Sequence, residues 1–148
     1  MSDTPPTGTP VDTAAATGGC LCGAVRYRVA APVDAIVMCH CTHCQKASGT
    51  GASANVIVPT AALTVERGTP RVFSQVVDSG NTLERHFCGD CGSPLWSRRA
   101  HQPERTVLKV GSLDAPEGRV VMNIWTRSAR AWTPMADAPR QFPQGTPG

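Results

Sequence analysis

The stretch GGCLCGAVRYRV, residues 18–29, joins a pair of cysteines to a segment in which apolar and polar side chains alternate. The alternating part, residues 24–29, places Val25, Tyr27 and Val29 on one face of an extended chain and the two arginines on the other. A period of two is typical of a half-buried β-strand. The stretch therefore predicts a strand that begins directly after a cysteine pair.

Further segments rich in apolar and β-branched residues have the length of strands and are bounded by turn residues. They predict strands at residues 35–41, 54–58, 71–77, 82–87, 106–110 and 120–125. Residues 78–81, Asp-Ser-Gly-Asn, have the composition of a hairpin turn, and only residues 42–48 favour a short helix. The sequence thus predicts a mostly β domain built from antiparallel sheets.

The chain has 148 residues, the size of one ordinary domain. Its two ends are rich in small and turn-forming residues and carry few large apolar side chains. We expect a disordered N-terminal tail at residues 1–17, a single folded domain at residues 18–134, and a Pro- and Gly-rich C-terminal tail at residues 135–148.

No segment has the basic start and apolar stretch of a secretory signal, and no apolar run approaches the ~20 residues of a membrane span. We therefore expect a cytoplasmic protein with no membrane partner, in which thiols stay reduced. The formal charge of +3 is small, and it counts all seven cysteines as neutral thiols, so any cysteine that loses its proton lowers it further. A nucleic-acid partner is accordingly not favoured.

Seven cysteines occur in three clusters and none is isolated. The clusters are Cys20-Leu21-Cys22, Cys39-His40-Cys41-Thr42-His43-Cys44 and Cys88-Gly89-Asp90-Cys91. In a reducing compartment such clusters bind metal more often than they form disulfides, and the odd count points the same way. Tetrahedral zinc needs sulfurs about 3.8 Å apart, a spacing that such local groups can provide.

A closed structural zinc site has four thiolates, and the first and last clusters together supply four. These four are Cys20, Cys22, Cys88 and Cys91. The central cluster supplies three more, Cys39, Cys41 and Cys44. They would leave a fourth position for water or a substrate, as in catalytic zinc sites. The alternative is that His40 or His43 fills that position and makes the second site structural as well.

These motifs resemble the glutathione-dependent formaldehyde-activating enzymes, a family that also includes the centromere protein V relatives. The resemblance runs from Gly18 to about Trp132. It rests on GGCLCGAVRY (18–27), CHCTHCQKASGTG (39–51), FCGDCGSPLW (87–96), GSLD (111–114) and IWTRSARAW (124–132). Three cysteine motifs in the order of the family make this match specific.

The resemblance implies an all-β fold of tent-like sheets stapled by two zinc ions per chain. The first and last cysteine pairs would hold a structural zinc, and the central three cysteines a catalytic zinc. The activity implied is the addition of glutathione to formaldehyde, classed with the carbon–sulfur lyases, so the expected partners are a small-molecule thiol and an aldehyde. Asn123 departs from the pattern, because the family commonly has a histidine just before the Ile-Trp segment.

Other polar residues flank the central cluster. His43 is the better candidate for a proton shuttle, since His40 faces away from the cysteines if residues 39–41 are extended. Lys46 and its neighbour Gln45 could orient a substrate carboxylate from the short helix. The alternative for Lys46 is a solvated side chain with no role.

Two functional hypotheses follow from these features. The first is a zinc-dependent carbon–sulfur lyase-type enzyme acting on a glutathione-like thiol and an aldehyde such as formaldehyde, or on a related adduct. The second is a non-catalytic zinc-binding module for a macromolecular partner. They differ at the central cluster, which an enzyme keeps open to an exchangeable ligand and a module closes with a histidine.

Overall fold

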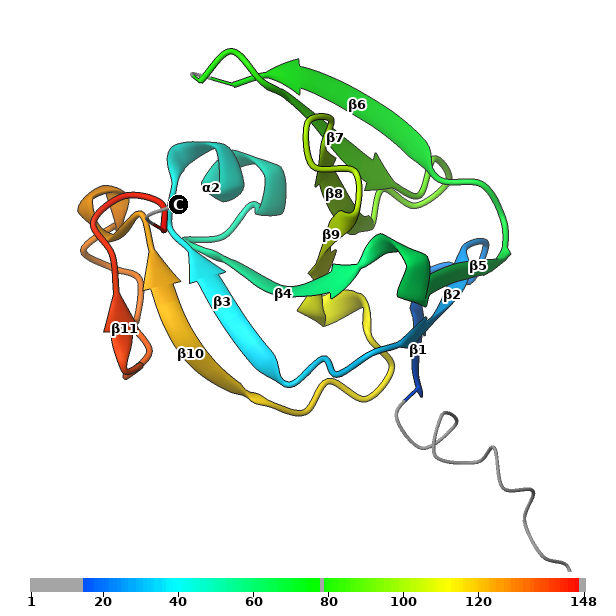
Figure 1. The fold of residues 1–148 in the computed structure, drawn as a ribbon, viewed down its shortest axis with the longest axis horizontal. Coiled ribbons are helices and arrows are strands. Elements are labelled where there is room, and N and C mark those ends of the chain that lie inside the picture. Colours follow the sequence, from blue (N-terminus) through cyan, green and yellow to red (C-terminus); the bar gives the residue numbers. More distant parts are fainter. Residues whose placement is uncertain (1–14, 78, 147–148) are drawn as a thin grey trace, which may run out of the picture.

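The computed structural model describes residues 15–77 and 79–146, and these form two β-sheets with one short α-helix (Figure 1). The strands are β1 (Ala15–Gly19), β2 (Arg26–Ala30), β3 (Ala35–Cys39), β4 (Ser53–Pro59), β5 (Leu63–Arg67), β6 (Arg71–Val76), β7 (Thr82–Phe87), β8 (Pro94–Arg99), β9 (Arg105–Lys109), β10 (Arg119–Ile124) and β11 (Arg140–Gln141). The helices are α2 (Thr42–Ser48) and the single 3₁₀ turns η1 (Thr60–Ala62), η2 (Val110–Ser112) and η3 (Thr126–Ser128). The predicted mostly β fold with at most a short helix is confirmed.

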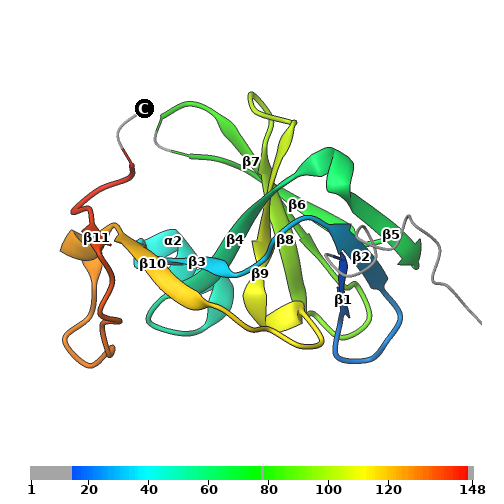
Figure 2. The ribbon, with the colours of Figure 1, turned by 60° about the horizontal axis from the view of Figure 1, so that its bottom comes forward.

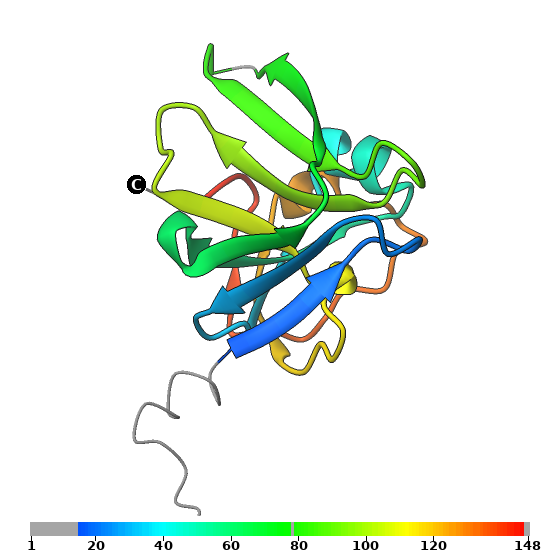
Figure 3. The same cartoon turned by 90° about the vertical axis from the view of Figure 1, so that its right-hand side faces the viewer.

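The small sheet has the strand order β1-β2-β5, and the large sheet has the order β11-β10-β3-β4-β9-β8-β7-β6. All strand pairs are antiparallel except those of β10, which runs parallel to both β3 and β11. The small sheet lies toward one end of the molecule and α2 toward the other (Figure 1, Figure 2). Seen from the first of these ends, the β1–β2 hairpin stands in front (Figure 3).

The hydrophobic core lies between the small sheet and one face of the large sheet. The residues of the alternating stretch that we predicted to be buried, Val25, Tyr27 and Val29, are at most 2% exposed. The ring of Tyr27 meets Trp96 of β8 edge-on, with ring centroids 5.7 Å apart. Trp96 pairs with Leu108 of β9, so both side chains belong to this buried face.

The opposite face of the large sheet carries polar side chains, and we call it the site face. Because residues directly opposite each other in a ladder share a face, the register assigns its members. Cys39 is opposite Ser53, Asn55 opposite Lys109, Ser97 opposite Arg85, and Phe73 opposite Arg85. Helix α2 lies on the same side of β4 as the β6–β7 hairpin (Figure 1).

Several predicted boundaries are wrong by a few residues. β3 ends at Cys39 rather than at residue 41, because Cys41 has left the strand to cap α2, with its Sγ accepting the Cys44 N–H. β10 ends at Ile124 because Trp125 has a φ of 58°, which no strand residue adopts. β1 begins at Ala15, inside the predicted disordered tail, of which residues 1–14 lie outside the described residues.

The Pro- and Gly-rich C-terminal segment lies against β10. Phe142 N–H donates to the Asn123 carbonyl at 2.9 Å and Trp125 N–H donates to the Gln144 carbonyl at 2.9 Å, both just after the short strand β11. In the predicted hairpin turn, Asp78 lies outside the described residues, and Gly80 has the positive φ of 87° that such a turn requires. None of the helices formed by the described residues has the length and apolar character needed to cross a membrane.

Candidate metal centres

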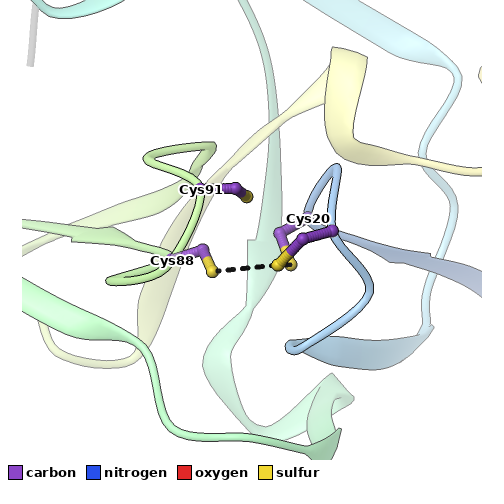
Figure 4. A group of neighbouring side chains, drawn as sticks. Cys20, Cys88 and Cys91 are labelled. Atoms are coloured by element: carbon purple, nitrogen blue, oxygen red, sulfur yellow. Dashed lines mark hydrogen bonds between the residues drawn. The ribbon is translucent and has the colours of Figure 1, made fainter.

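Four cysteines from two turns far apart in the sequence converge on one point. They are Cys20, Cys22, Cys88 and Cys91, which we call the four-cysteine site (Figure 4). The Sγ atoms of Cys20 and Cys22 are 3.7 Å apart, those of Cys22 and Cys88 are 3.8 Å apart, and all four lie within 4.8 Å of one another. Because the edge of a zinc–thiolate tetrahedron is about 3.8 Å, the site fits Zn²⁺ with four thiolate ligands.

Both halves of this site are tight turns that aim backbone N–H groups at sulfur. After β1, Val25 N–H donates to Cys20 Sγ at 3.2 Å, and after β7, Asp90 N–H donates to Cys88 Sγ at 3.4 Å. Gly23 and Gly92 have φ values of 84° and 80°, so each turn needs a glycine. Such N–H···S bonds stabilise the thiolate form that a metal requires.

The central three cysteines also converge, and we call them the cysteine triple. Cys39 is the last residue of β3, Cys41 is the N-cap of α2, and Cys44 lies in the first turn of that helix. Their three Sγ atoms lie within 4.8 Å of one another, and no described histidine, aspartate or glutamate belongs to the group. The donor set therefore fits a zinc ion with three thiolates and a fourth position left for another ligand.

The three thiols of the triple differ in pKa. The Cys39 and Cys44 thiols donate hydrogen bonds that lower the pKa of Cys41 to about 2, and the Cys44 N–H adds to this effect. The hydrogen bonds that the Cys39 thiol makes with Cys41 and Cys44 raise the pKa of Cys39 far above its usual range, and burial adds to this effect. One thiolate therefore forms readily, and a cation must overcome the repulsion that opposes the next two.

Both histidines of the central motif have defined places. His40 is 1% exposed and lies on the opposite side of β3 from Cys39, where its Nε2 is 3.1 Å from Asn123 Oδ1. His43 lies on α2 and lines a cavity of about 370 Å³ together with Lys46. Gln45 is engaged elsewhere, because its amide bridges the carbonyls of His40 and Ser128 and accepts a bond from Arg130.

The sequence comparison decides the family. A model of the family described as glutathione-dependent formaldehyde-activating enzyme (GFA) matches residues 15–128, more than three quarters of the chain. The chain belongs to the GFA family.

One relative in sequence and one solved structure can be compared with the chain in more detail. A Halomonas elongata protein named "Putative glutathione-dependent formaldehyde-activating enzyme" is 35% identical over 91 residues, which cover 59% of this chain and 58% of that protein. A Rhodobacter sphaeroides protein, solved by crystallography in a structural genomics programme, superposes with a TM-score of 0.54 at 21% identity. The superposition covers 67% of this chain and 88% of that one, and it shows a shared fold.

Asn123, the position at which the resemblance implied a histidine, is fully buried. Its Oδ1 faces His40 Nε2, and its Nδ2 donates to the Ala136 carbonyl at 2.9 Å. It lies on the far side of β3 from the triple, because its register partner is Met38 rather than Cys39. Asn123 therefore orients His40 and the C-terminal segment and does not face the reacting position.

Sequence reasoning missed Lys109, the last residue of β9. Its ammonium donates to Ser53 Oγ at 2.9 Å and to Asn55 Oδ1 at 2.8 Å, and it lines the cavity beside α2. Burial lowers the pKa of Lys109, whereas the nearby thiols of the triple raise it. A lysine inside the otherwise apolar run Thr106–Val110 was the available signal, since a strand that is buried on both faces has no place for one.

Proposed function

We propose that this chain is a zinc-dependent enzyme of the carbon–sulfur lyase type, acting on a glutathione-like thiol and an aldehyde such as formaldehyde, or on their adduct. The single observation that carries the proposal is the cysteine triple, which gathers three thiols with no fourth protein ligand among the described residues. It is supported by membership of the GFA family and by the printed name of the Halomonas elongata relative.

The two metal centres take different roles in this proposal. The four-cysteine site holds a structural zinc, because four thiolates complete its coordination. The triple holds the catalytic zinc, and Cys39, Cys41 and Cys44 are its active-site ligands. When bound there, zinc supplies a positive charge that stabilises a thiolate at neutral pH and so raises its nucleophilicity.

The remaining chemistry belongs to residues of the chain. The substrate sulfur forms a bond to the aldehyde carbon, and the proton that leaves the thiol ends on the former carbonyl oxygen. His43, on the cavity side of α2, is placed to carry this proton. Lys109 supplies a fixed positive charge to the anion that develops, because Ser53 and Asn55 hold its ammonium in place. Lys46 lines the same cavity and orients the substrate.

The alternative proposal is a non-catalytic zinc module for a macromolecular partner. It requires His40 or His43 as a fourth protein ligand at the triple, but His40 is held by Asn123 and His43 does not belong to the group of ligand atoms. The adjacent cavity also suits a small molecule better than a protein surface. For either function the seven cysteines, all free, require a reducing compartment, and we propose the cytoplasm.

The deciding experiment combines zinc analysis with calorimetric titration of glutathione into the wild type and Cys41→Ser. We expect two zinc ions per wild-type chain, one per variant chain, and thiol binding by the wild type alone. Two zinc ions in the wild type with no thiol binding would favour the module.

A further inference from the structure

The cavity beside the triple has a volume of about 370 Å³, which is larger than a substrate the size of formaldehyde would fill. It is lined on one side by α2 and on the other by β6, β7, β8 and β9, mostly through their site face, with His86 and Trp96 contributing from the opposite face. A second hollow adjoins it, and the two share Ser48, Ser53, Pro94 and Lys109. The cavity thus offers room for a non-reacting part of the substrate.

The charged side chains that line this cavity are all of one sign. They are Lys46, Arg85 and Lys109, and no Asp or Glu is among the described lining residues. The two ion pairs of the described chain join Arg26 to Asp114 and Arg28 to Glu66, so neither Lys109 nor Arg85 has an acidic partner. Arg85 is close enough that its charge lowers the pKa of Lys109. Two partly buried cations that repel each other favour a bound anion between them.

The triple does not balance these charges alone. Three thiolates and one Zn²⁺ carry one negative charge, and a bound substrate thiolate would add another. The three basic side chains exceed that total by one. A carboxylate on the substrate would complete the balance.

Next to Arg85, two phenylalanines make part of the cavity wall apolar. Phe73 is directly opposite Arg85 in the β6–β7 ladder, lines the cavity, and is 57% exposed although it is an aromatic residue. Phe87, two residues along β7 from Arg85, lines the same cavity. An exposed aromatic side chain that faces a cavity is stabilised when an apolar ligand covers it.

The strand order determines how far Lys109 and Arg85 lie from the triple along the large sheet. Arg85 lies four strands from Cys39, and Lys109 two strands, so at ~4.8 Å per strand the path along the curved sheet is about 19 Å to Arg85 and about 10 Å to Lys109. A substrate that reacts at the triple must therefore extend several bonds to bring a second group between Lys109 and Arg85.

We propose that the thiol substrate of this enzyme has an apolar, aromatic body and a carboxylate, with the carboxylate held between Lys109 and Arg85 and the body against Phe73 and Phe87. This inference rests on the proposed function, and it extends the proposed thiol substrates from glutathione-like thiols to aryl-acid thiols. Arg85 and Phe73 then determine specificity, whereas the triple performs the chemistry.

The test uses probes that contain no thiol, so that it does not depend on the zinc chemistry. 3-Phenylpropionate, its neutral amide, and acetate are titrated calorimetrically into the zinc-loaded protein and into Cys41→Ser. We expect 3-phenylpropionate to bind at least about tenfold more tightly than either the amide or acetate, because a charge-assisted bond and an apolar contact each contribute about that factor. Arg85→Gln and Phe73→Ala should each weaken binding about tenfold.

Matched controls come from the same strands. Arg99→Gln removes an exposed arginine from β8, and Val72→Ala removes an apolar side chain from β6 next to Phe73; neither residue lines the cavity. Both should leave the affinity unchanged, and thermal melting should show all four variants folded. Equal binding of acid and amide, or of acid and acetate, would overturn the inference, as would an Arg85→Gln affinity equal to that of the wild type.

The binding data distinguish failure of the proposed enzymatic function from failure of the proposed substrate class. If the wild type binds 3-phenylpropionate in this pattern but no thiol, the cavity assignment stands and the catalytic role falls. If it binds glutathione but not 3-phenylpropionate, the enzyme stands and the aryl-acid class is wrong.

Discussion

At the scale of single residues, the seven cysteines are chemically alike but structurally divided. Four lie where turns from distant strands meet, and three lie within one strand end and the first turn of a helix. A ligand in the first group joins the two sheets, whereas a ligand in the second group joins only β3 to α2. The same substitution should therefore have different effects in the two groups.

We predict that Cys20→Ser and Cys88→Ser unfold much of the domain and that Cys41→Ser leaves it folded with one zinc fewer. Structural zinc contributes folding free energy outright, so the first two variants should melt at least about 10 °C below the wild type. Circular dichroism melting with metal analysis gives the comparison. Equal melting temperatures in all three variants would contradict the division into structural and catalytic sites.

Substitutions of Lys109 test how much a positive charge, rather than metal coordination, contributes to substrate binding. Lys109→Met removes the ammonium but keeps the length of the side chain, so the affinity for glutathione should fall about tenfold or more, as for the loss of a charge-assisted hydrogen bond. Lys109→Arg should recover part of that loss. Zinc content should stay at two per chain in both variants, and an unchanged thiol affinity in Lys109→Met would show that the ammonium does not face the substrate.

At the scale of elements, Asp114 joins β1 and β2 to the loop after η2. Its carboxylate accepts hydrogen bonds from Thr17 and from Arg26, which pairs with it as an ion, and this lowers the pKa of Asp114 to about 2. The neighbouring backbone continues the contact, since Asp114 N–H donates to the Thr17 carbonyl at 2.9 Å. The pair therefore fastens the first strand to the rest of the domain.

A pH dependence follows from this pair. Because the folded-state pKa is below the ordinary value of 3.8, the stabilisation is fully present above about pH 4 and is lost as the pH falls toward 2. Solvent screens the half-exposed pair, so its contribution is about 1 kcal/mol or less. The difference in unfolding free energy between the wild type and Asp114→Asn should shrink over this interval. A constant difference would show that the pair does not stabilise the fold.

At the scale of the whole molecule, the two metal centres should separate in a chelator titration. The triple has one protein ligand fewer than the four-cysteine site and adjoins a cavity, so its zinc should be removed first. We expect that first loss to abolish thiol binding with little change in the melting temperature, and the second to unfold the domain. Thermal unfolding that follows the loss of the first zinc would contradict this order.

Local patterns predicted most of this architecture, and long-range pairing lay beyond them. Alternation located β2 and the neighbouring strands, and cysteine spacing predicted both groups that the structure brings together. The parallel pairing of β10 with β3, more than eighty residues apart, has no local signature. β8 was missed because Pro94 and the preceding cysteine turn obscure its start.

The polar residues of the site likewise divide into those that the local sequence predicts and those that depend on long-range strand pairing. His43 and Lys46 were found because they flank the cysteines in sequence. Lys109 and Arg85 reach the site only through the register of five strands, and their individual strands give no indication that the two charges meet. A side chain that acts through sheet register cannot be identified until the strand order is known.

The ligands of the two metal centres are separated by very different lengths of chain, which affects the order in which the two sites can form during synthesis. The triple spans six residues, whereas the four-cysteine site joins residues 66 positions apart. If both sites bind zinc as proposed, a growing chain holds all three ligands of the triple once residues 39–44 have emerged, whereas closing the larger loop is slower because its entropic cost must be met first. The proposed catalytic ion would then be acquired before the proposed structural ion.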